Sequence, residues 1–396
     1  MTQEKRLFLK KGREKPVLYL HPWIYSGAVD RVEGDPLPGE TIQIVDKSGT
    51  FLAWGSFSPE SQIRTRIWSW NPDEHISRDF LHTRIKLSLQ YRNQIGLDSQ
   101  MKRLVYAESD GLPGLIVDQY ADTLVVQFLS AGSEYWKDEI VKILTELTSA
   151  KTIYERSDAQ VRQLEGLPQR TGTLVGPEPG QLLKIREQNL DFWIDIHRGH
   201  KSGFYLDQRD NRDLIGRMCR GKSVLDCFCY TGGFSVHALK NGADSTTLVD
   251  ESERALNLAE KNITLNNLET ERIEILRGDV FQVLRKFRDQ ARKFDAIILD
   301  PPKFAPTASF ANKAARGYKD INLLALKLLN PGGLLATFSC SGGISRDFFL
   351  RILSGAALDA EVNARIQVNM GQSADHSVNL SFPEGEYLKG YVIRVA

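Results

Sequence analysis

The chain has 396 residues, of which 41% are hydrophobic and 26% are charged, and its formal net charge is +1 at pH 7. This length suits two or three domains, and the near-neutral charge argues against indiscriminate coating of nucleic acid while leaving room for a local basic surface. No apolar run approaches the roughly 20 residues that cross a bilayer, and the start MTQEKRLFLKKGREK is too charged for a secretory signal. We therefore expect a cytoplasmic protein with no membrane association. The 4 cysteines match neither a disulfide framework nor a zinc spacing, so no metal is expected.

The N-terminal part, residues 1–73, is rich in short β-segments separated by turns, which is typical of a small β-barrel. In GETIQIVDKSGTFLAWGSF, alternating apolar residues flank a DKSG turn, and this piece resembles the PUA module of RNA-modifying enzymes. The resemblance implies an RNA-binding domain with Arg13, His21, Trp23 and Arg64 as candidate contacts.

Residues 74–185 read as a small α+β domain. Helices are expected in DFLHTRIKLSLQYRNQ and EYWKDEIVKILTELTS, and strands in GLPGLIVDQYADTLVVQFLS and from KTIYERSD onward. The segment TGTLVGPEPGQ, rich in Gly and Pro, is expected to be an exit loop or a linker. We assign no catalytic residue to this part.

Residues 186–396 alternate between strands and helices, which predicts a Rossmann-like, mostly parallel, doubly wound α/β domain. The successive strands are expected in SVLDCF, STTLVD, IEILRGD, FDAIILD and LLATFS. The helices between and after them are expected in FSVHALKNG, SERALNLAEKNITLNN, VFQVLRKFRDQA, RGYKDINLLALKLLN and FFLRILSGAALDA. Two further strands, VNARIQVNM and GYVIRVA, follow where most dinucleotide-binding folds would continue with parallel strands.

The first strand of this domain runs through Asp226 into a glycine turn, and a helix is expected to begin near Phe234. Two glycines, Gly232 and Gly233, allow the backbone to approach a ligand closely. Taken alone this pattern is weak, because the full GxGxxG fingerprint is absent and a simple strand-to-helix turn would look the same.

Acidic residues at three further strand ends strengthen the case for a ligand site: Asp250, Asp279 and Asp300. A carboxylate at the second strand end is the usual acceptor for ribose hydroxyl groups, which predicts this role for Asp250. By the same logic Asp279 would accept a hydrogen bond from the adenine amino group. Upstream, Gln208 in GFYLDQRDNR is a candidate to reach the same ligand.

The missing phosphate fingerprint argues against a nicotinamide cofactor, whose pyrophosphate needs a glycine-rich helix start. S-adenosylmethionine carries no phosphate and ends in an ammonium group. That group suits a carboxylate such as Asp226 and the backbone from Tyr230 to Gly233. The sequence therefore favours S-adenosylmethionine as the methyl-donating cofactor.

The segment FDAIILDPPKF places Asp300 and two prolines directly after a buried strand, and Cys340 follows the next strand in LLATFSCSGG. Because proline fixes φ and cannot extend a strand ladder, Pro301 and Pro302 predict a stiff, open loop that can grip a flat ring. A thiol at the neighbouring strand end would share the same crevice. The pair indicates covalent chemistry on a pyrimidine, although a buried strand-end cysteine is the commoner case.

Taken together, these motifs resemble the PUA-containing 23S ribosomal RNA cytosine-5 methyltransferases of the class I S-adenosylmethionine-dependent superfamily. The resemblance spans nearly the whole chain and includes HPWIYSGAV, AESDGLPGLIVD, HKSGFYLDQR, FCYTGGFSVHA, DPPKF, RGYKDIN, FSCSG and YLKG. One departure is the pair Cys227 and Cys229 around Phe228 in the glycine-turn motif, where Cys229 stands at a position that is often Ser in relatives. The resemblance implies 23S ribosomal RNA, in the large subunit or its assembly intermediate, as the partner. A homodimer is one option for the oligomeric state.

The family's reaction explains the thiol, because carbon 5 of cytosine is a poor nucleophile until a thiolate adds to carbon 6. We assign Cys340 as this nucleophile and Asp300 as the group that binds the amino and ring-nitrogen edge of the base. Phe304 is a candidate to stack on the base. The group that removes the carbon 5 proton is left open, with His197, His200 and His376 available.

Three other functions fit parts of the pattern. An RNA methyltransferase acting on purine nitrogens would use the DPP loop for direct transfer and would need no cysteine. A nicotinamide oxidoreductase is disfavoured by the missing fingerprint, and bound nucleotide would reveal it. A ribosome assembly factor without enzymatic activity would bind RNA and leave the base unchanged.

Overall fold

The computed structural model describes residues 5–97, 99–304 and 311–396. The chain divides into two compact units. The first unit comprises Met1–Gln188, Ile194–Leu206 and Ala374–Gly385, and the second comprises Asn189–Trp193, Asp207–Ser373 and Glu386–Ala396. Within the described residues, no helix has the length and apolarity required of a membrane span.

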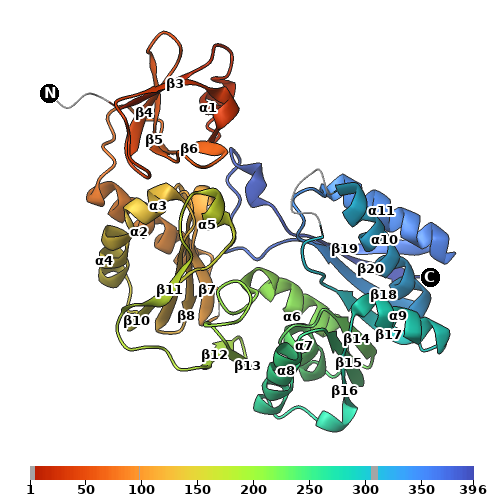
Figure 1. Cartoon of the computed structure of the whole chain (residues 1–396). Helices are drawn as coiled ribbons and strands as arrows, with labels where there is room; N and C mark the ends of the chain where they lie inside the picture. Colours follow the sequence, from red (N-terminus) through yellow and green to blue (C-terminus); the bar gives the residue numbers. More distant parts are fainter. Residues whose placement is uncertain (1–4, 98, 305–310) are drawn as a thin grey trace. The chain divides into compact units, whose positions relative to one another are not determined.

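The N-terminal part of the first unit is a six-stranded sheet that curls on itself (Figure 1). Its strands, in the spatial order β2-β6-β5-β4-β1-β3, are β1 Arg6–Leu9, β2 Trp23–Tyr25, β3 Val29–Glu33, β4 Thr41–Val45, β5 Phe51–Phe57 and β6 Ile63–Ser69, with the short helix α1 Lys15–Leu18. Alternate residues of β4, Ile42 and Ile44, face the core of this sheet. The expected barrel-like N-terminal domain is confirmed.

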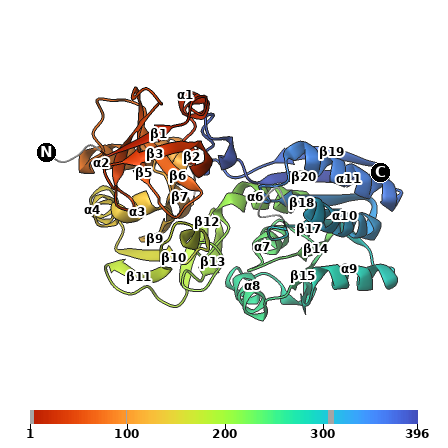
Figure 2. The same cartoon turned by 45° about the horizontal axis from the view of Figure 1, so that its top comes forward.

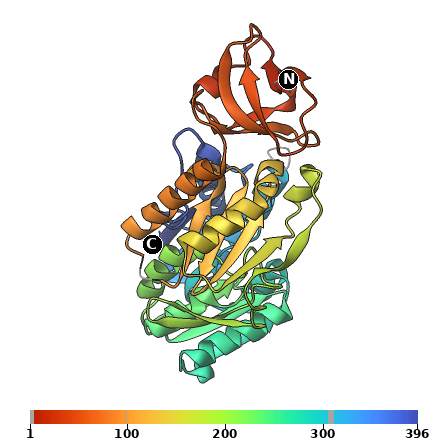
Figure 3. The same cartoon turned by 90° about the vertical axis from the view of Figure 1, so that its left-hand side faces the viewer.

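A five-stranded sheet follows, in the order β11-β10-β9-β8-β7. Its strands are β7 Met101–Tyr106, β8 Leu115–Tyr120, β9 Thr123–Phe128, β10 Thr152–Ser157 and β11 Arg170–Val175. The accompanying helices are α2 Arg78–Gln94, α3 Ala131–Tyr135, α4 Lys137–Leu147 and α5 Val161–Leu164. Figure 3 shows α2 and α4 lying across the sheet, and Leu81, Ile85, Ile140 and Ile143 of these helices belong to one buried cluster with the strands. The strands β12 Leu183–Glu187 and β13 Leu190–Ile194 come next in the sequence.

The second unit is built on a seven-stranded sheet in the order β16-β15-β14-β17-β18-β20-β19 (Figure 2). Its strands are β14 Ser223–Cys227, β15 Ser245–Asp250, β16 Ile273–Arg277, β17 Phe294–Leu299, β18 Leu329–Ser339, β19 Ala364–Met370 and β20 Lys389–Val395. The first five are parallel to one another, whereas β20 runs antiparallel to both β18 and β19. The expected α/β fold is therefore confirmed.

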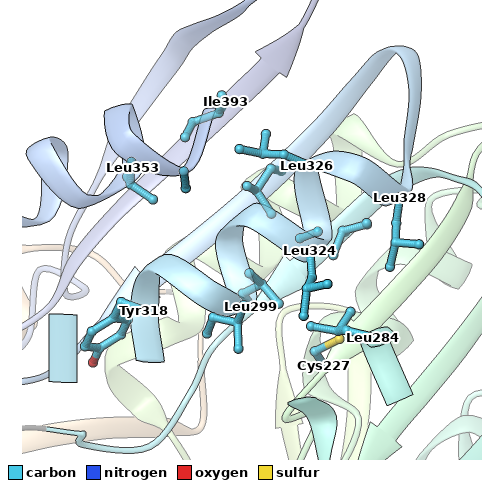
Figure 4. Packing of buried hydrophobic residues seen from close by; sticks show 14 of the residues in the cluster. Cys227, Leu284, Leu299, Tyr318, Leu324, Leu326, Leu328, Leu353 and Ile393 are labelled. Atoms are coloured by element: carbon cyan, nitrogen blue, oxygen red, sulfur yellow. The ribbon is translucent and has the colours of Figure 1, made fainter. Parts of the chain in front are cut away.

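The helices of the second unit are α6 Arg209–Met218, α7 Gly233–Lys240, α8 Glu253–Leu265, α9 Val280–Asp289, α10 Ala311–Leu328 and α11 Arg346–Ala360. Short 3-10 turns occur at Ser26–Ala28, Ala107–Asp110, Leu206–Gln208, Thr270–Arg272 and Pro383–Gly385. Figure 4 shows how Leu324 and Leu328 of α10 pack with Leu284 and Cys227 in one apolar cluster beside the sheet. This packing holds β14 and β17, which carry most of the candidate site, in a rigid layer.

Candidate active site

The candidate site lies where the strand order of the large sheet reverses. β14 pairs with β15 on one side and with β17 on the other, and all three are parallel. Ligands of open α/β sheets bind outside the carboxyl ends of the strands at such a point. The predicted site residues that lie at or just beyond these ends are Asp226, Tyr230, Gly232, Gly233, Asp250 and Asp300.

Asp226 lies inside β14 and is completely buried. Its Oδ2 accepts hydrogen bonds from the backbone N–H and the hydroxyl of Ser235, at 3.2 and 2.7 Å. Its Oδ1 is buried as well and has no hydrogen-bond partner in the described part of the chain. Burial raises the pKa of this carboxyl to about 7 because the ionised form loses its hydration, and the charges of Asp300 and Asp250 act in the same direction. The unused oxygen suits a cationic group of a ligand.

The turn after β14 has a left-handed backbone at three positions, with φ values of 59° at Phe228, 48° at Tyr230 and 75° at Gly232. The backbone N–H of Tyr230 donates to Oδ2 of Asp250 at 2.9 Å. A Cβ atom on Gly232 would lie 2.9 Å from Cβ of Ala259. The positive φ favours glycine at position 232 and the close contact with Ala259 excludes a larger residue without a shift, so the turn is fixed directly before the first residue of α7.

Asp250 is the last residue of β15, and its Oδ1 accepts a hydrogen bond from the backbone N–H of Ser252 at 2.9 Å. Asp279 differs from the expectation that it closes the next strand, because β16 ends at Arg277. The side chain of Asp279 instead caps α9 by accepting from the backbone N–H of Gln282 at 2.9 Å. A capping aspartate favours the start of a helix over continuation of the strand.

Gln208 stands at the N-terminal boundary of α6 and is buried. Its Oε1 accepts a hydrogen bond from Nδ2 of Asn211 at 2.6 Å. Its Nε2 is buried and, among the residues described, has no hydrogen-bond partner. The contact of Gln208 with a cofactor stays a prediction.

The structure brings the thiol and the DPP loop together. β17 and β18 are parallel neighbours, with Leu299 opposite Thr337, so the residues that follow them emerge at the same edge of the sheet. Sγ of Cys340 lies 3.9 Å from the carbonyl O of Pro301. Cys340 is partly exposed, whereas the other three cysteines are buried. The thiol open to a substrate is thus the one beside the loop.

Aromatic side chains pack behind this loop. The ring centroid of Phe304 lies 4.8 Å from that of Tyr318 and 5.9 Å from that of Phe281. The hydroxyl groups of Tyr318 and Ser341 are 3.0 Å apart. Burial raises the pKa of Tyr318 to about 12, so its hydroxyl stays protonated at neutral pH. Phe304 is therefore tied into the packing of the loop, and its stacking on a base stays a prediction.

Lys389 lies in the segment YLKG, and no role for it was predicted from the sequence. It opens β20, is only 5% exposed, and donates a hydrogen bond from Nζ to the carbonyl O of Ser341 at 2.8 Å. A lysine at the start of a strand that is mostly apolar, KGYVIRV, was the available signal.

The three histidines considered as bases belong to the first unit. His197 lies 3.1 Å from the hydroxyl of Tyr154, and His376 is buried with its Nδ1 2.9 Å from Oδ1 of Asp375. His200 lies 3.2 Å from the hydroxyl of Tyr205. Each ring thus has a side-chain neighbour in its own unit, as expected of structural histidines.

Three of the four candidate RNA contacts are engaged inside the first unit. Nε1 of Trp23 donates to Oε1 of Glu108 at 2.8 Å, and the rings of Trp23 and His21 meet edge to face with centroids 6.0 Å apart. Arg64 donates to a carbonyl of its own loop, whereas Arg13 is exposed. Arg13 is therefore the most accessible of the four.

The residues present fit S-adenosylmethionine. The buried Oδ1 of Asp226 lacks a partner within the described chain, and the turn at Gly232 leaves no room for a side chain. These features provide an anionic acceptor and a closely approachable backbone, which the ammonium end of the donor requires. In the described residues, no group of three or more His, Cys, Asp or Glu side chains is arranged to hold a metal ion.

Comparisons with known proteins identify the family of the chain and proteins of the same fold. A family model described as S-adenosylmethionine-dependent methyltransferase matches residues 110–369, and one described as PUA-like domain matches residues 7–70. Two solved structures share the fold. A Streptococcus mutans protein assigned to the S-adenosylmethionine-dependent methyltransferases is 21% identical with a TM-score of 0.85, covering 98% of this chain and all (100%) of that one. SMU.776, complexed with SAH, is 22% identical with a TM-score of 0.86 and the same coverage, 98% and 100%.

More similar relatives carry the name ribosomal RNA large subunit methyltransferase I. The protein from Tolumonas auensis is 49% identical over 391 residues, covering 98% of each chain. The protein from Erwinia tasmaniensis is 47% identical over 392 residues, covering 98% of this chain and 99% of its own. Identity at this level over nearly the full length shows that the chain belongs to the ribosomal RNA large subunit methyltransferase I family of S-adenosylmethionine-dependent methyltransferases.

Proposed function

We propose that this enzyme transfers a methyl group from S-adenosylmethionine to carbon 5 of a cytosine in 23S ribosomal RNA through a covalent adduct with Cys340. The observation that carries the proposal is the 3.9 Å contact between Sγ of Cys340 and the carbonyl O of Pro301, next to Asp300. The names of the relatives support ribosomal RNA of the large subunit, or its assembly intermediate, as the substrate. Because ribosomes are assembled in the cytoplasm, we place the reaction there.

The reaction begins when the Cys340 thiolate forms a bond to carbon 6 of the cytosine. Asp300 binds the amino and ring-nitrogen edge and stabilises the adduct, whose carbon 5 is now nucleophilic. When bound, S-adenosylmethionine supplies a methyl group that its sulfonium makes electrophilic. After carbon 5 has taken the methyl group, loss of its proton to a base re-forms the double bond, breaks the bond to carbon 6 and releases the thiolate.

Activation of the thiol supplies only part of the rate. A free cysteine with a pKa of about 8.5 is only a few per cent thiolate at neutral pH, and a pKa near 7 would raise that fraction roughly fifteen-fold. This factor corresponds to about 1.6 kcal/mol of activation free energy, less the nucleophilicity lost as the pKa falls. Positioning by the rigid DPP loop must therefore supply most of the remainder.

For the cofactor, we propose that Asp226 and the turn from Tyr230 to Gly233 receive the amino-acid end. Asp250 would accept the ribose hydroxyl groups, Asp279 the adenine amino group, and Gln208 would approach from α6. Among the described residues, the buried Oδ1 of Asp226 has no hydrogen-bond partner. This free oxygen and the strand-end position of Asp250 support these assignments.

We further propose three domains, with an RNA-binding PUA domain at 1–73, a central α+β domain at 74–185 and the methyltransferase domain at 186–396. The N-terminal curled sheet and its PUA-like match support the first boundary. A base stacked inside a duplex cannot reach a thiol, so the target cytosine would lie in a single-stranded loop or be flipped out.

Methyl transfer to ribosomal RNA that lacks modifications tests this function. The wild type, Cys340→Ala and the buried-thiol control Cys219→Ala would be compared, and the modified nucleoside identified by mass spectrometry. We expect 5-methylcytosine from the wild type and the control and none from Cys340→Ala. A methylated purine, or activity that survives loss of Cys340, would show direct N-methylation instead.

A further inference from the structure

Lys389 is anchored to the turn that carries the proposed nucleophile. It stands opposite Ser339 in the pairing of β20 with β18, and its Nζ donates to the carbonyl O of Ser341 at 2.8 Å. These two serines flank Cys340. The same carbonyl also accepts a hydrogen bond from the backbone N–H of Ile344 at 3.1 Å, which closes the turn. The ammonium is therefore fixed beside the backbone that positions the thiol.

The close approach of β20 to β18 depends on a small residue. Gly390 pairs with Phe338, and a Cβ atom at position 390 would lie 2.5 Å from the ring of Phe338. Glycine avoids this clash, so β20 can pair closely with the end of β18 and Lys389 can contact the carbonyl O of Ser341. The Lys-Gly pair thus sets the position of the ammonium.

The charge of Lys389 has a cost that its single hydrogen bond does not explain. Within the described part of the chain, Lys389 forms no ion pair, and it is only 5% exposed. Burial of an uncompensated ammonium is unfavourable, and a neutral donor could also form the hydrogen bond to the carbonyl of Ser341. Burial lowers the pKa of Lys389 to about 8, and the charge that opposes this shift most strongly is that of a Cys340 thiolate. The positive charge of Lys389 would stabilise the negative charge of Cys340 when the thiol is ionised.

We propose that Lys389 is a positioning residue that stabilises the thiolate form of Cys340 and holds its turn beside the DPP loop. The inference rests on the covalent role proposed for Cys340. An opposite charge nearby lowers the pKa of an acid by about 1 to 3 units, so removal of the ammonium shifts the ionisation of Cys340 to higher pH. In the resting enzyme Lys389 is mostly protonated at pH 7, below its own pKa of about 8.

Other ionisable groups surround Lys389 and Cys340, and replacement of Lys389 alone leaves all of them in the protein. They come from the loop after β17, from α10, from α11 and from the segment around the start of β20: Asp300, Lys303, Tyr318, Arg346, Glu386 and Tyr391. A change seen when only Lys389 is replaced is therefore due to Lys389.

The rate of alkylation of Cys340 by iodoacetamide, measured on the full chain from pH 6 to 9, tests the inference. Cys340 is the partly exposed cysteine, and the three buried ones serve as internal controls in peptide mass spectrometry. Lys389→Gln keeps a donor for Ser341 without the charge, and Lys389→Arg keeps the charge. We expect Lys389→Gln to react about ten-fold more slowly at pH 7, with a profile shifted up by about one unit, and Lys389→Arg to resemble the wild type.

Equal alkylation profiles for Lys389→Gln and the wild type would overturn the inference. So would equal slowing in Lys389→Gln and Lys389→Arg, because that result shows a packing role. SAH binding and thermal melting verify that each variant is folded, and Lys389→Met provides a second neutral variant if Lys389→Gln does not fold.

The alkylation assay measures the reactivity of the Cys340 thiol and does not depend on methyl transfer. If Cys340→Ala retains methyl transfer, the covalent role fails, whereas a shifted alkylation profile would still show that Lys389 ionises the thiol. If Cys340→Ala is inactive and the profile does not shift, the proposed function stands and the inference about Lys389 is wrong. In the supporting case, Lys389→Gln also lowers kcat about ten-fold at pH 7 with little change in KM.

Discussion

The backbone N–H of Tyr230 donates a hydrogen bond to Oδ2 of Asp250 at 2.9 Å, so the turn after β14 is fastened to the end of β15. The same carboxylate is the proposed acceptor for the ribose of the cofactor. Under this proposal Asp250 has two functions, because it shapes the turn and would also bind the ligand. We therefore expect replacement of Asp250 to reduce cofactor affinity more than it reduces the stability of the fold.

Asp250→Ala should weaken SAH binding by more than ten-fold, because a hydrogen bond to a charged group contributes about 1.5 to 3 kcal/mol. Isothermal titration calorimetry measures the effect. Glu260→Ala, an exposed acid on α8, is the matched control and should bind SAH as the wild type does. Unchanged affinity in Asp250→Ala would remove this residue from the cofactor site.

Gly232→Ala tests the shape of the turn. The residue has φ of 75°, and a Cβ atom would lie 2.9 Å from Cβ of Ala259, so both strain and a clash are expected. Gly221→Ala is the matched control, because its φ of 66° is similar but no atom of the residues that the structure describes lies within 4 Å of its Cβ position. Gly232→Ala should lose more thermal stability and bind SAH more weakly than Gly221→Ala. Equal losses in the two variants would show that the backbone alone matters.

The raised pKa of Asp226 predicts a pH dependence of stability. Its pKa is about 7 in the folded protein, against about 3.9 for a free side chain, so between these values the folded state holds a proton that the unfolded state has lost. The contribution of this group to stability therefore falls as pH rises from about 4 to 7, at up to about 1.4 kcal/mol per pH unit.

The side chain in Asp226→Asn cannot ionise, so this variant does not lose stability through deprotonation at position 226. In the absence of cofactor, the free energy of unfolding of Asp226→Asn relative to the wild type should rise by about 2 to 3 kcal/mol between pH 5 and 8. Urea unfolding at the two pH values measures the difference. Asp347→Asn, at an exposed position in α11, should show little such change. A constant difference for Asp226→Asn would mean that this carboxyl titrates normally.

A buried ion pair supports the five-stranded sheet of the first unit. Nε and one terminal nitrogen of Arg103 each donate to a carboxylate oxygen of Asp118 at 2.8 Å, and both residues are buried. Asp118→Ala should lower the free energy of unfolding by about 3 to 5 kcal/mol, because it removes the carboxylate that accepts both hydrogen bonds from a buried guanidinium. Asp122→Ala removes the partner of the exposed Lys151 and should change denaturant unfolding little. Similar effects of the two changes would contradict this account.

Much of the fold was predictable because its signals are local. The Asp-Pro-Pro sequence stops β17 by the chemistry of proline, and the glycine turn marks the start of α7. The predicted end of β16 was wrong by two residues. Asp279 follows the strand closely in the sequence, but its side chain caps α9. The exact ends of strands and helices are uncertain by one or two residues, and this error is of that size.

The candidate site was predictable in part, because parallel strands deliver their ends to one edge of a sheet. That rule anticipated the meeting of Cys340 with the loop of Asp300. It could not anticipate Lys389, which reaches the site from an antiparallel strand whose register the sequence does not specify. The hydrogen bond from Trp23 to Glu108 could not be predicted either, because it joins side chains that are far apart in the sequence.

The covalent step is the central claim, and RNA carrying 5-fluorocytidine tests it most directly. Fluorine at carbon 5 cannot leave as a proton does, so the adduct formed after methyl transfer should persist. With S-adenosylmethionine present, we expect a denaturation-resistant complex whose cross-linked peptide contains Cys340, formed by the wild type and by Cys219→Ala but not by Cys340→Ala. Methylation of the unmodified RNA without any trapped complex, or a cross-link at another residue, would contradict the account.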